Sequence, residues 1–165
     1  MGNKLWYMIL LLLFTFMSIK TVAAADKQLV MLKVGDKVPD FTMMSSNGAP
    51  QRLSEQIGNP VMLIWLEECS QCSEALIEWQ YLAESWAVEG LKTWVIWEKE
   101  EGDKAPWSRL PVLIYDSNNP YAWWFDESPA VMLINPDGYL DHVFIDEVKS
   151  SRKKVSEKIK VWLKN

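Results

Sequence analysis

Apolar residues in this chain fall into short continuous runs and into longer stretches with helical spacing. A continuous run bounded by turn residues is typical of a strand that is covered on both faces of a sheet. Four runs predict such strands: Val61–Leu66, Leu91–Trp97, Leu110–Tyr115 and Ala130–Ile134. Tyr139–Ile145 follows a Pro-Asp-Gly turn and is predicted to be an antiparallel return strand.

Two segments have apolar residues at steps of three and four, which predicts amphipathic helices. The first runs from Cys69 to Gly90, where glycine is a typical residue beyond a helix end. Its apolar stripe consists of Cys72, Leu76, Trp79, Leu82, Ala83 and Trp86. The second helix ends at Leu163, and we expect Ser150 or Ser151 to cap its start.

The remaining segments complete an α/β pattern. Phe41–Met44 and Gln51–Leu53 flank Asn47-Gly48, a strong hairpin signal. Residues 26–34 show no clear periodicity, and residues 116–125 are predicted to form a turn and a short helix. Strands that alternate with helices, followed by a terminal hairpin and a helix, predict an α/β fold with a mixed sheet.

Residues 1–25 have the layout of a targeting segment. Lys4 precedes an apolar stretch, Leu5–Ile19, and Thr21–Ala25 offers small residues for cleavage. The stretch is shorter than the roughly 20 residues that a membrane-spanning helix needs. We therefore predict a signal peptide followed by one domain, residues 26–165. Lys20 interrupts the pattern, so an uncleaved anchor is the alternative.

The charge of the chain is acidic. The formal net charge is −5, and removal of residues 1–25, which hold two lysines and no acid, changes it to −7. Nucleic-acid binding needs a basic face, so this class of function is excluded. Export would place the cysteines where disulfides form and persist.

Cys69-Ser-Gln-Cys72 holds the only two cysteines, at the junction of a predicted strand and helix. A disulfide that closes so short a loop stabilises a fold by about 2 kcal/mol, against about 4.7 for a loop of 100 residues. This favours a redox pair over a structural one. A metal would need two further ligands, and the sequence offers no second Cys/His cluster. His142, the only histidine, is predicted to be a surface strand residue.

Three segments resemble the TlpA/ResA-type exported thioredoxin-like proteins, which are related to the AhpC/TSA group. One is Gly35–Phe41 with the Asn47-Gly48 and Leu53-Ser54 pairs after it, and the second is Ile64-Trp65 followed by Cys69-x-x-Cys72. The third is Ser128-Pro129 with the run and turn that end at Gly138. The resemblance extends from about residue 33 to the end of the chain.

The resemblance implies a thioredoxin-like fold, with a mixed central sheet flanked by helices and an added N-terminal β-hairpin. It implies a cis peptide at Ser128–Pro129, facing the cysteines. It further implies a periplasmic or other extracytoplasmic thiol–disulfide oxidoreductase, which acts as a monomer on disulfides of client proteins. No cofactor beyond a Cys69–Cys72 disulfide is expected, and a membrane reductant of the DsbD/CcdA type is implied.

The sequence departs from the family pattern around the cysteines. Glu68 stands where relatives usually have tryptophan, and Ala75 stands where they have glutamate. Glu74 is one place earlier, about 100° around the helix. Leu63 occupies the place of the buried aspartate of thioredoxin. The usual proton-handling acid is therefore missing or replaced.

The residues predict roles for the two cysteines. A helix N-terminus would stabilise the thiolate of Cys69, which attacks, and Cys72 would resolve the mixed disulfide. Glu67 and Glu68 are expected to raise the pKa of the neighbouring thiol, which favours a reductant or an isomerase-like donor; the alternative is that both are solvated and shift this pKa little. Glu67 and Glu74 are also candidates for a proton relay, with solvated surface acids as the alternative.

Trp107, Trp123 and Trp124 lie in segments that connect the predicted strands of the domain. They could form an aromatic lip for a partner chain, or they could pack in the core. A second hypothesis for the whole protein is a thioredoxin-fold interaction module of an envelope assembly, with a disulfide that is not catalytic.

Overall fold

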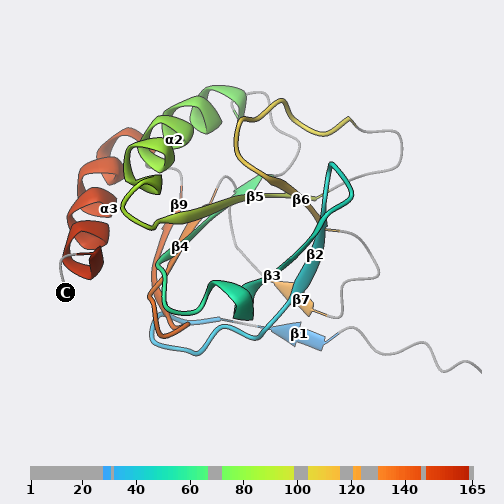
Figure 1. Ribbon diagram of the computed structural model, residues 1–165, viewed down its shortest axis with the longest axis horizontal. Helices are drawn as coiled ribbons and strands as arrows, with labels where there is room; N and C mark the ends of the chain where they lie inside the picture. Colours follow the sequence, from blue (N-terminus) through green and yellow to red (C-terminus); the bar gives the residue numbers. More distant parts are fainter. Residues whose placement is uncertain are drawn as a thin grey trace, which may run out of the picture.

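The structure, a computed structural model, describes residues 28–30, 32–66, 72–98, 104–115, 121–123, 130–145 and 148–163. In this part of the chain, a large mixed sheet carries two helices on one side (Figure 1). Its strands are β2 (Thr42–Ser45), β3 (Pro50–Arg52), β4 (Val61–Leu66), β5 (Lys92–Glu98), β6 (Val112–Tyr115), β8 (Ala130–Ile134) and β9 (Leu140–Ile145). The helices are α2 (Cys72–Ala87) and α3 (Val148–Leu163), with a 3₁₀ turn η1 (Leu53–Gln56).

The strand order of the large sheet is β3-β2-β6-β5-β4-β8-β9. β4 lies inside the sheet, parallel to β5 and antiparallel to β8. All six residues of β4 are buried, as its continuous apolar run predicts. The predicted mixed sheet is confirmed, and the strand before the first cysteine is one of its most enclosed elements.

The two faces of the sheet bury separate hydrophobic clusters. On one face, α2 and α3 cover alternate residues of β4, and their own apolar stripes complete this cluster. The buried apolar residues of α2 and α3 in this cluster are Leu76, Trp79, Leu82, Ala83, Val155 and Ile159. The opposite face packs against the N-terminal part of the domain through Val38, Phe41, Met43 and Leu53. Burial of both faces explains why all six residues of β4 are apolar.

The predicted N-terminal hairpin is present. β2 and β3 pair antiparallel, and Gly48 adopts a φ of 85° in the turn between them. Glycine takes this left-handed conformation without steric cost. β2 also pairs with β6, so the hairpin extends the sheet at one edge.

Two sequence predictions are wrong. Residues 121–123, predicted to lie in a turn and short helix, form a strand, β7 (Tyr121–Trp123). It pairs in parallel with β1 (Gln28–Val30), which lies in a segment without periodicity. Each segment forms a strand because the other, distant in the sequence, supplies its backbone hydrogen bonds, and such pairing leaves no local sequence pattern. α3 begins at Val148, and Ser150 and Ser151 lie in its first turn instead of capping it.

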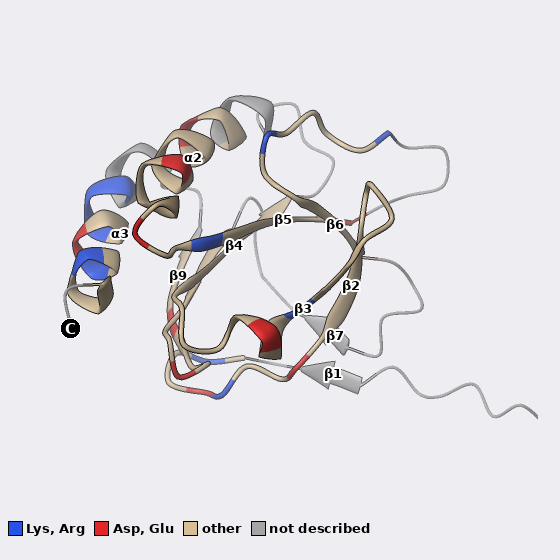
Figure 2. Cartoon of the chain, viewed as in Figure 1, with Lys and Arg blue, Asp and Glu red and all other residues tan. Residues whose placement is uncertain are grey.

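The helices carry opposite charges (Figure 2). α2 contains glutamates and no basic residue, whereas α3 is rich in lysine. An ion pair between Arg152 and Glu78 joins the two helices. In the described part of the chain, neither helix has the length and apolar character needed to cross a membrane. The predicted signal segment, residues 1–25, lies outside that part.

Candidate functional site

The junction between β4 and α2 is the candidate site, because the cysteine pair spans it in the sequence. β4 ends at Leu66, and α2 begins at Cys72. The helix is fixed on the sheet by fully buried side chains, among them Trp79. The structure therefore places the second cysteine at the first residue of a firmly packed helix, where backbone N–H groups lack intrahelical partners.

The end of β4 and the start of β8 lie at the same edge of the sheet. Trp65 of β4 is opposite Ala130 of β8 in the antiparallel register. The Trp65 ring contacts that of Tyr115 at a centroid distance of 5.3 Å, which fixes it in the core. The chain therefore leaves β4, which precedes Cys69 in the sequence, at the same end of the sheet at which it enters β8, which follows Pro129.

Several predicted site residues lie outside the described residues: Cys69, Glu67, Glu68, Ser128, Pro129 and Trp124. Cys72 and Glu74 lie in the first turn of α2, and Trp123 is the last residue of β7. The roles assigned to all of these residues stay predictions.

Leu63, at the position of the thioredoxin aspartate, is fully buried. It belongs to the apolar cluster on the face opposite the helices, together with Trp94 and Met132. Leu63 itself has no ionisable group, in agreement with the sequence, so this position cannot relay a proton.

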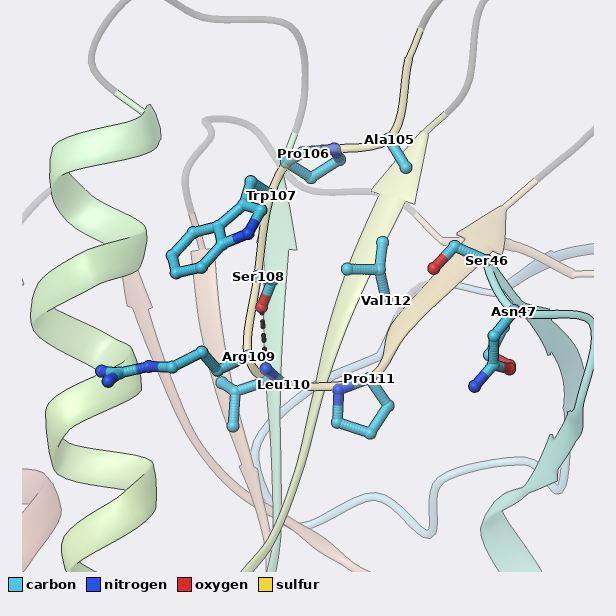
Figure 3. A pocket seen from close by; sticks show the side chains of 11 residues that line it. Ser46, Asn47, Ala105, Pro106, Trp107, Ser108, Arg109, Leu110, Pro111 and Val112 are labelled. Carbon is cyan, nitrogen blue, oxygen red and sulfur yellow. Dashed lines mark hydrogen bonds between the residues drawn. The ribbon is translucent and has the colours of Figure 1, made fainter.

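Residues 104–111 form a strap that runs beside α2 and leads into β6 (Figure 3). Arg109 holds it to the helix in three ways. Its backbone N–H donates to Oε1 of Gln80 at 3.2 Å, and its Nε lies 2.9 Å from Oε1 of Glu84. Its guanidinium also lies 5.4 Å from the centroid of the Tyr81 ring. These contacts fix the strap on the helix that begins with Cys72.

An open pocket of about 530 Å³ lies between this strap and the β2–β3 turn. Residues 45–47 and 105–112 line it, with hydroxyl, amide and proline groups (Figure 3). Inside the strap, the N–H of Leu110 donates to Oγ of Ser108 at 3.0 Å. This arrangement offers mainly polar groups and no described cluster of acids or histidines.

Trp107, a predicted partner contact, lies on the strap and is 78% exposed. Its indole extends toward α2, on the same side as Arg109 (Figure 3). β7, which carries Trp123, lies in another part of the molecule, next to β1 (Figure 1). Trp107 and the β7 backbone therefore lie in separate parts of the molecule, and the lip stays a prediction.

Sequence reasoning missed the strap and its attachment to α2. Residues 98–109 look like a charged loop, and a single arginine with partners in a distant helix leaves no periodic signal. His142, predicted on the surface, lies on β9 and is part-exposed, with Nδ1 3.0 Å from Oδ2 of Asp141. That prediction is confirmed.

The mixed sheet, the N-terminal hairpin and the helix that follows the central strand define a thioredoxin-like protein. Residues 34–143 match the AhpC/TSA family, and the chain belongs to this family. The predicted fold and family are therefore confirmed. A comparison with curated protein sequences finds no match.

Solved structures with similar folds are distant in sequence. A protein described as thiol:disulfide interchange protein DsbE, from Chlorobium tepidum, has a TM-score of 0.67 and 19% identity, covering 80% of this chain and 99% of that chain. The thioredoxin domain of a thiol-disulfide oxidoreductase from Bacteroides vulgatus has a TM-score of 0.63 and 14% identity, with coverages of 78% and 99%. The exposed lipoprotein thioredoxin of Streptococcus pneumoniae has a TM-score of 0.60 and 18% identity, with coverages of 74% and 99%.

Proposed function

We propose that the protein is an extracytoplasmic thiol–disulfide oxidoreductase that reduces disulfides of client proteins through Cys69 and Cys72. The observation that carries this proposal is the β4–α2 junction. A buried central strand leads into the cysteine pair, and the second cysteine starts a packed helix. Membership of the AhpC/TSA family and the names of the structural neighbours support the same chemistry.

The reaction is two successive thiol–disulfide exchanges. The Cys69 thiolate attacks one sulfur of the client disulfide, and the other client sulfur leaves as a thiolate. The Cys72 thiolate then attacks Cys69 in the mixed disulfide and releases the second client thiolate. The client gains two electrons, and the protein is left with a Cys69–Cys72 disulfide, which needs no other cofactor. We propose that a membrane reductant of the DsbD/CcdA type restores the dithiol.

Extracytoplasmic action is supported by the signal-like segment 1–25 and by the exposed lipoprotein among the structural neighbours. A reducing role in an oxidising compartment requires electrons to be supplied across the membrane. We propose that the domain acts as a monomer in this compartment.

The experiment that tests the proposal is disulfide reduction by the purified protein. We expect turnover of insulin disulfides with dithiothreitol as the electron source, above the rate with dithiothreitol alone. Cys69→Ser should abolish this turnover. Cys72→Ser, reduced and then freed of dithiothreitol, should accumulate a mixed disulfide with the client. A parent protein with no turnover and no trapped client would refute the proposal.

A second function is favoured by one observation. Leu63 is buried in an apolar cluster where thioredoxin has its acid, so the proton relay of that enzyme is absent at this position. An interaction module whose disulfide stays oxidised would not need the relay. Retention of partner binding in Cys69→Ser, together with no turnover in the parent protein, would favour this module.

A further inference from the structure

Three large side chains beside the strap are exposed to solvent. Ile77 and Tyr81 are 48% and 60% exposed on α2, and Trp107 is 78% exposed on the strap. Residues four apart lie on the same face of a helix, so Ile77 and Tyr81 form a stripe. Trp107 extends toward this helix (Figure 3). We call these three residues the docking surface.

The docking surface is held in place although it is exposed. Tyr81 lies under the Arg109 guanidinium, and the Arg109 backbone bonds to Gln80, which is almost fully buried. Trp107 is two residues along the strap from this anchor. Aromatic side chains fixed before binding lose little conformational entropy when a partner covers them. Tryptophan, tyrosine and arginine are also the residues enriched at binding hot spots.

Two glutamates of α2 next to the docking surface are paired within the protein. Glu84 binds Arg109, and Glu78 binds Arg152. α2 is therefore less acidic at this face than its sequence indicates. A surface of exposed aromatic and aliphatic groups with neutralised charges is complementary to an uncharged apolar segment, and it gives no advantage to a strongly charged one.

The docking surface is close to the cysteine end of α2. At a rise of 1.5 Å per residue, Ile77 and Tyr81 lie about 8 and 14 Å from Cys72 along the helix axis. An extended polypeptide advances about 3.3 Å per residue. A client chain joined to the site through its cysteine would reach the docking surface with its third or fourth residue.

We propose that Ile77, Tyr81 and Trp107 bind an uncharged apolar or aromatic side chain of an extended client polypeptide, three or four residues from the cysteine that Cys69 attacks. This inference rests on the proposed function and adds the class of client segment. The docking surface selects clients with such a side chain near their disulfide, whereas the cysteines act on any accessible disulfide.

The test uses the full chain with Cys72→Ser and two synthetic peptides. Each peptide has one cysteine, joined to thionitrobenzoate as a mixed disulfide, and they differ only in tryptophan or serine four residues from the cysteine, on both sides. Cys69 attacks the peptide sulfur, the new disulfide joins Cys69 to the peptide, and thionitrobenzoate leaves with the bonding electron pair as a coloured thiolate. We expect the tryptophan peptide to react roughly five- to tenfold faster, the effect typical of one hot-spot side chain.

Trp107→Ala and Ile77→Ser, each added to Cys72→Ser, should reduce this preference to about twofold or less. Val88→Ser is the matched control. Val88 is 95% exposed in the turn directly after α2, at the end of the helix away from Cys72, so the preference should be unchanged. The thionitrobenzoate adduct of free cysteine should react equally with all variants, which shows that they are folded.

Equal rates for the two peptides, with a normal rate for the free-cysteine adduct, would overturn the docking proposal and leave the proposed function standing. Loss of preference in Val88→Ser as well as in Trp107→Ala would also overturn it. If Cys69 reacts with no adduct, the proposed function itself fails and the docking proposal fails with it.

Discussion

Leu63 and Met132 are direct partners across β4 and β8, and both side chains are fully buried. Thioredoxin, which this chain resembles, has an aspartate at the position of Leu63. Here the position is part of a buried hydrophobic cluster that also contains Trp94 and Met132. The chemistry at the cysteines must therefore work without an acid at this place.

Leu63→Asp should destabilise the protein strongly, because it buries a carboxyl group without a partner. We expect a loss of at least about 3 kcal/mol in the free energy of unfolding near neutral pH. Burial raises the pKa of this carboxyl above its unfolded value of about 3.9. Between the two pKa values the native state binds more protons, so stability falls as pH rises.

Urea denaturation at several pH values measures this effect, with Leu63→Asn as the control. Asparagine has nearly the same shape and no titratable group, so the difference between the two variants isolates the carboxyl. The difference should grow from about pH 4 upward. Parallel pH profiles of the two variants would contradict the prediction.

Glu67→Gln with Glu68→Gln should make the cysteine couple less reducing. Loss of two negative charges beside Cys69 lowers the pKa of its thiol and stabilises the reduced form. The reduction potential should rise by up to about 30 mV for each pKa unit. Equilibration with glutathione buffers measures it. Glu55→Gln, an exposed acid in η1, is the control and should leave the potential unchanged. An unchanged potential in the double variant would show that Glu67 and Glu68 are simply solvated.

The sequence predicted the centre of the fold well and its periphery poorly. Val61–Leu66 was predictable to the residue because a strand buried on both faces needs a continuous apolar run. The hairpin was predictable because Asn47-Gly48 suits one kind of turn. The pairing of β1 with β7 was not, since it depends on backbone groups of segments far apart in the chain. For the candidate site, the cysteine motif is visible in the sequence. The position of the strap depends on contacts between Arg109 and α2, which leave no pattern in the sequence.

Gly138→Ala should destabilise the turn between β8 and β9. Gly138 has a φ of +87°, and a Cβ there would lie 2.8 Å from Cδ1 of Ile57. The backbone conformation costs about 1 kcal/mol for alanine, and the contact adds to it. We expect a loss of about 1–3 kcal/mol in the free energy of unfolding.

A double-mutant cycle with Ile57→Val separates the two contributions. Valine lacks the Cδ1 atom, so the contact disappears and only the backbone cost should remain. Gly138→Ala should therefore be less harmful in the Ile57→Val background, by about 0.5–1 kcal/mol. Equal costs in both backgrounds would show that Ile57 moves away freely.

Gln80→Leu should loosen the strap more than Arg109→Met does. Gln80 is almost fully buried and accepts the backbone N–H of Arg109, a bond worth about 1 kcal/mol. The Arg109–Glu84 pair is largely exposed, so screening leaves it well below that value. Hydrogen exchange of the Arg109 amide, measured by NMR, should accelerate about fivefold in Gln80→Leu and less in Arg109→Met. In 1 M salt the exchange rate of this amide in the parent protein should approach its rate in Arg109→Met, because screening weakens the ion pair. The rate in Gln80→Leu should stay distinct. A larger effect from Arg109→Met at high salt would mean that the guanidinium, rather than the buried amide, holds Trp107 in position.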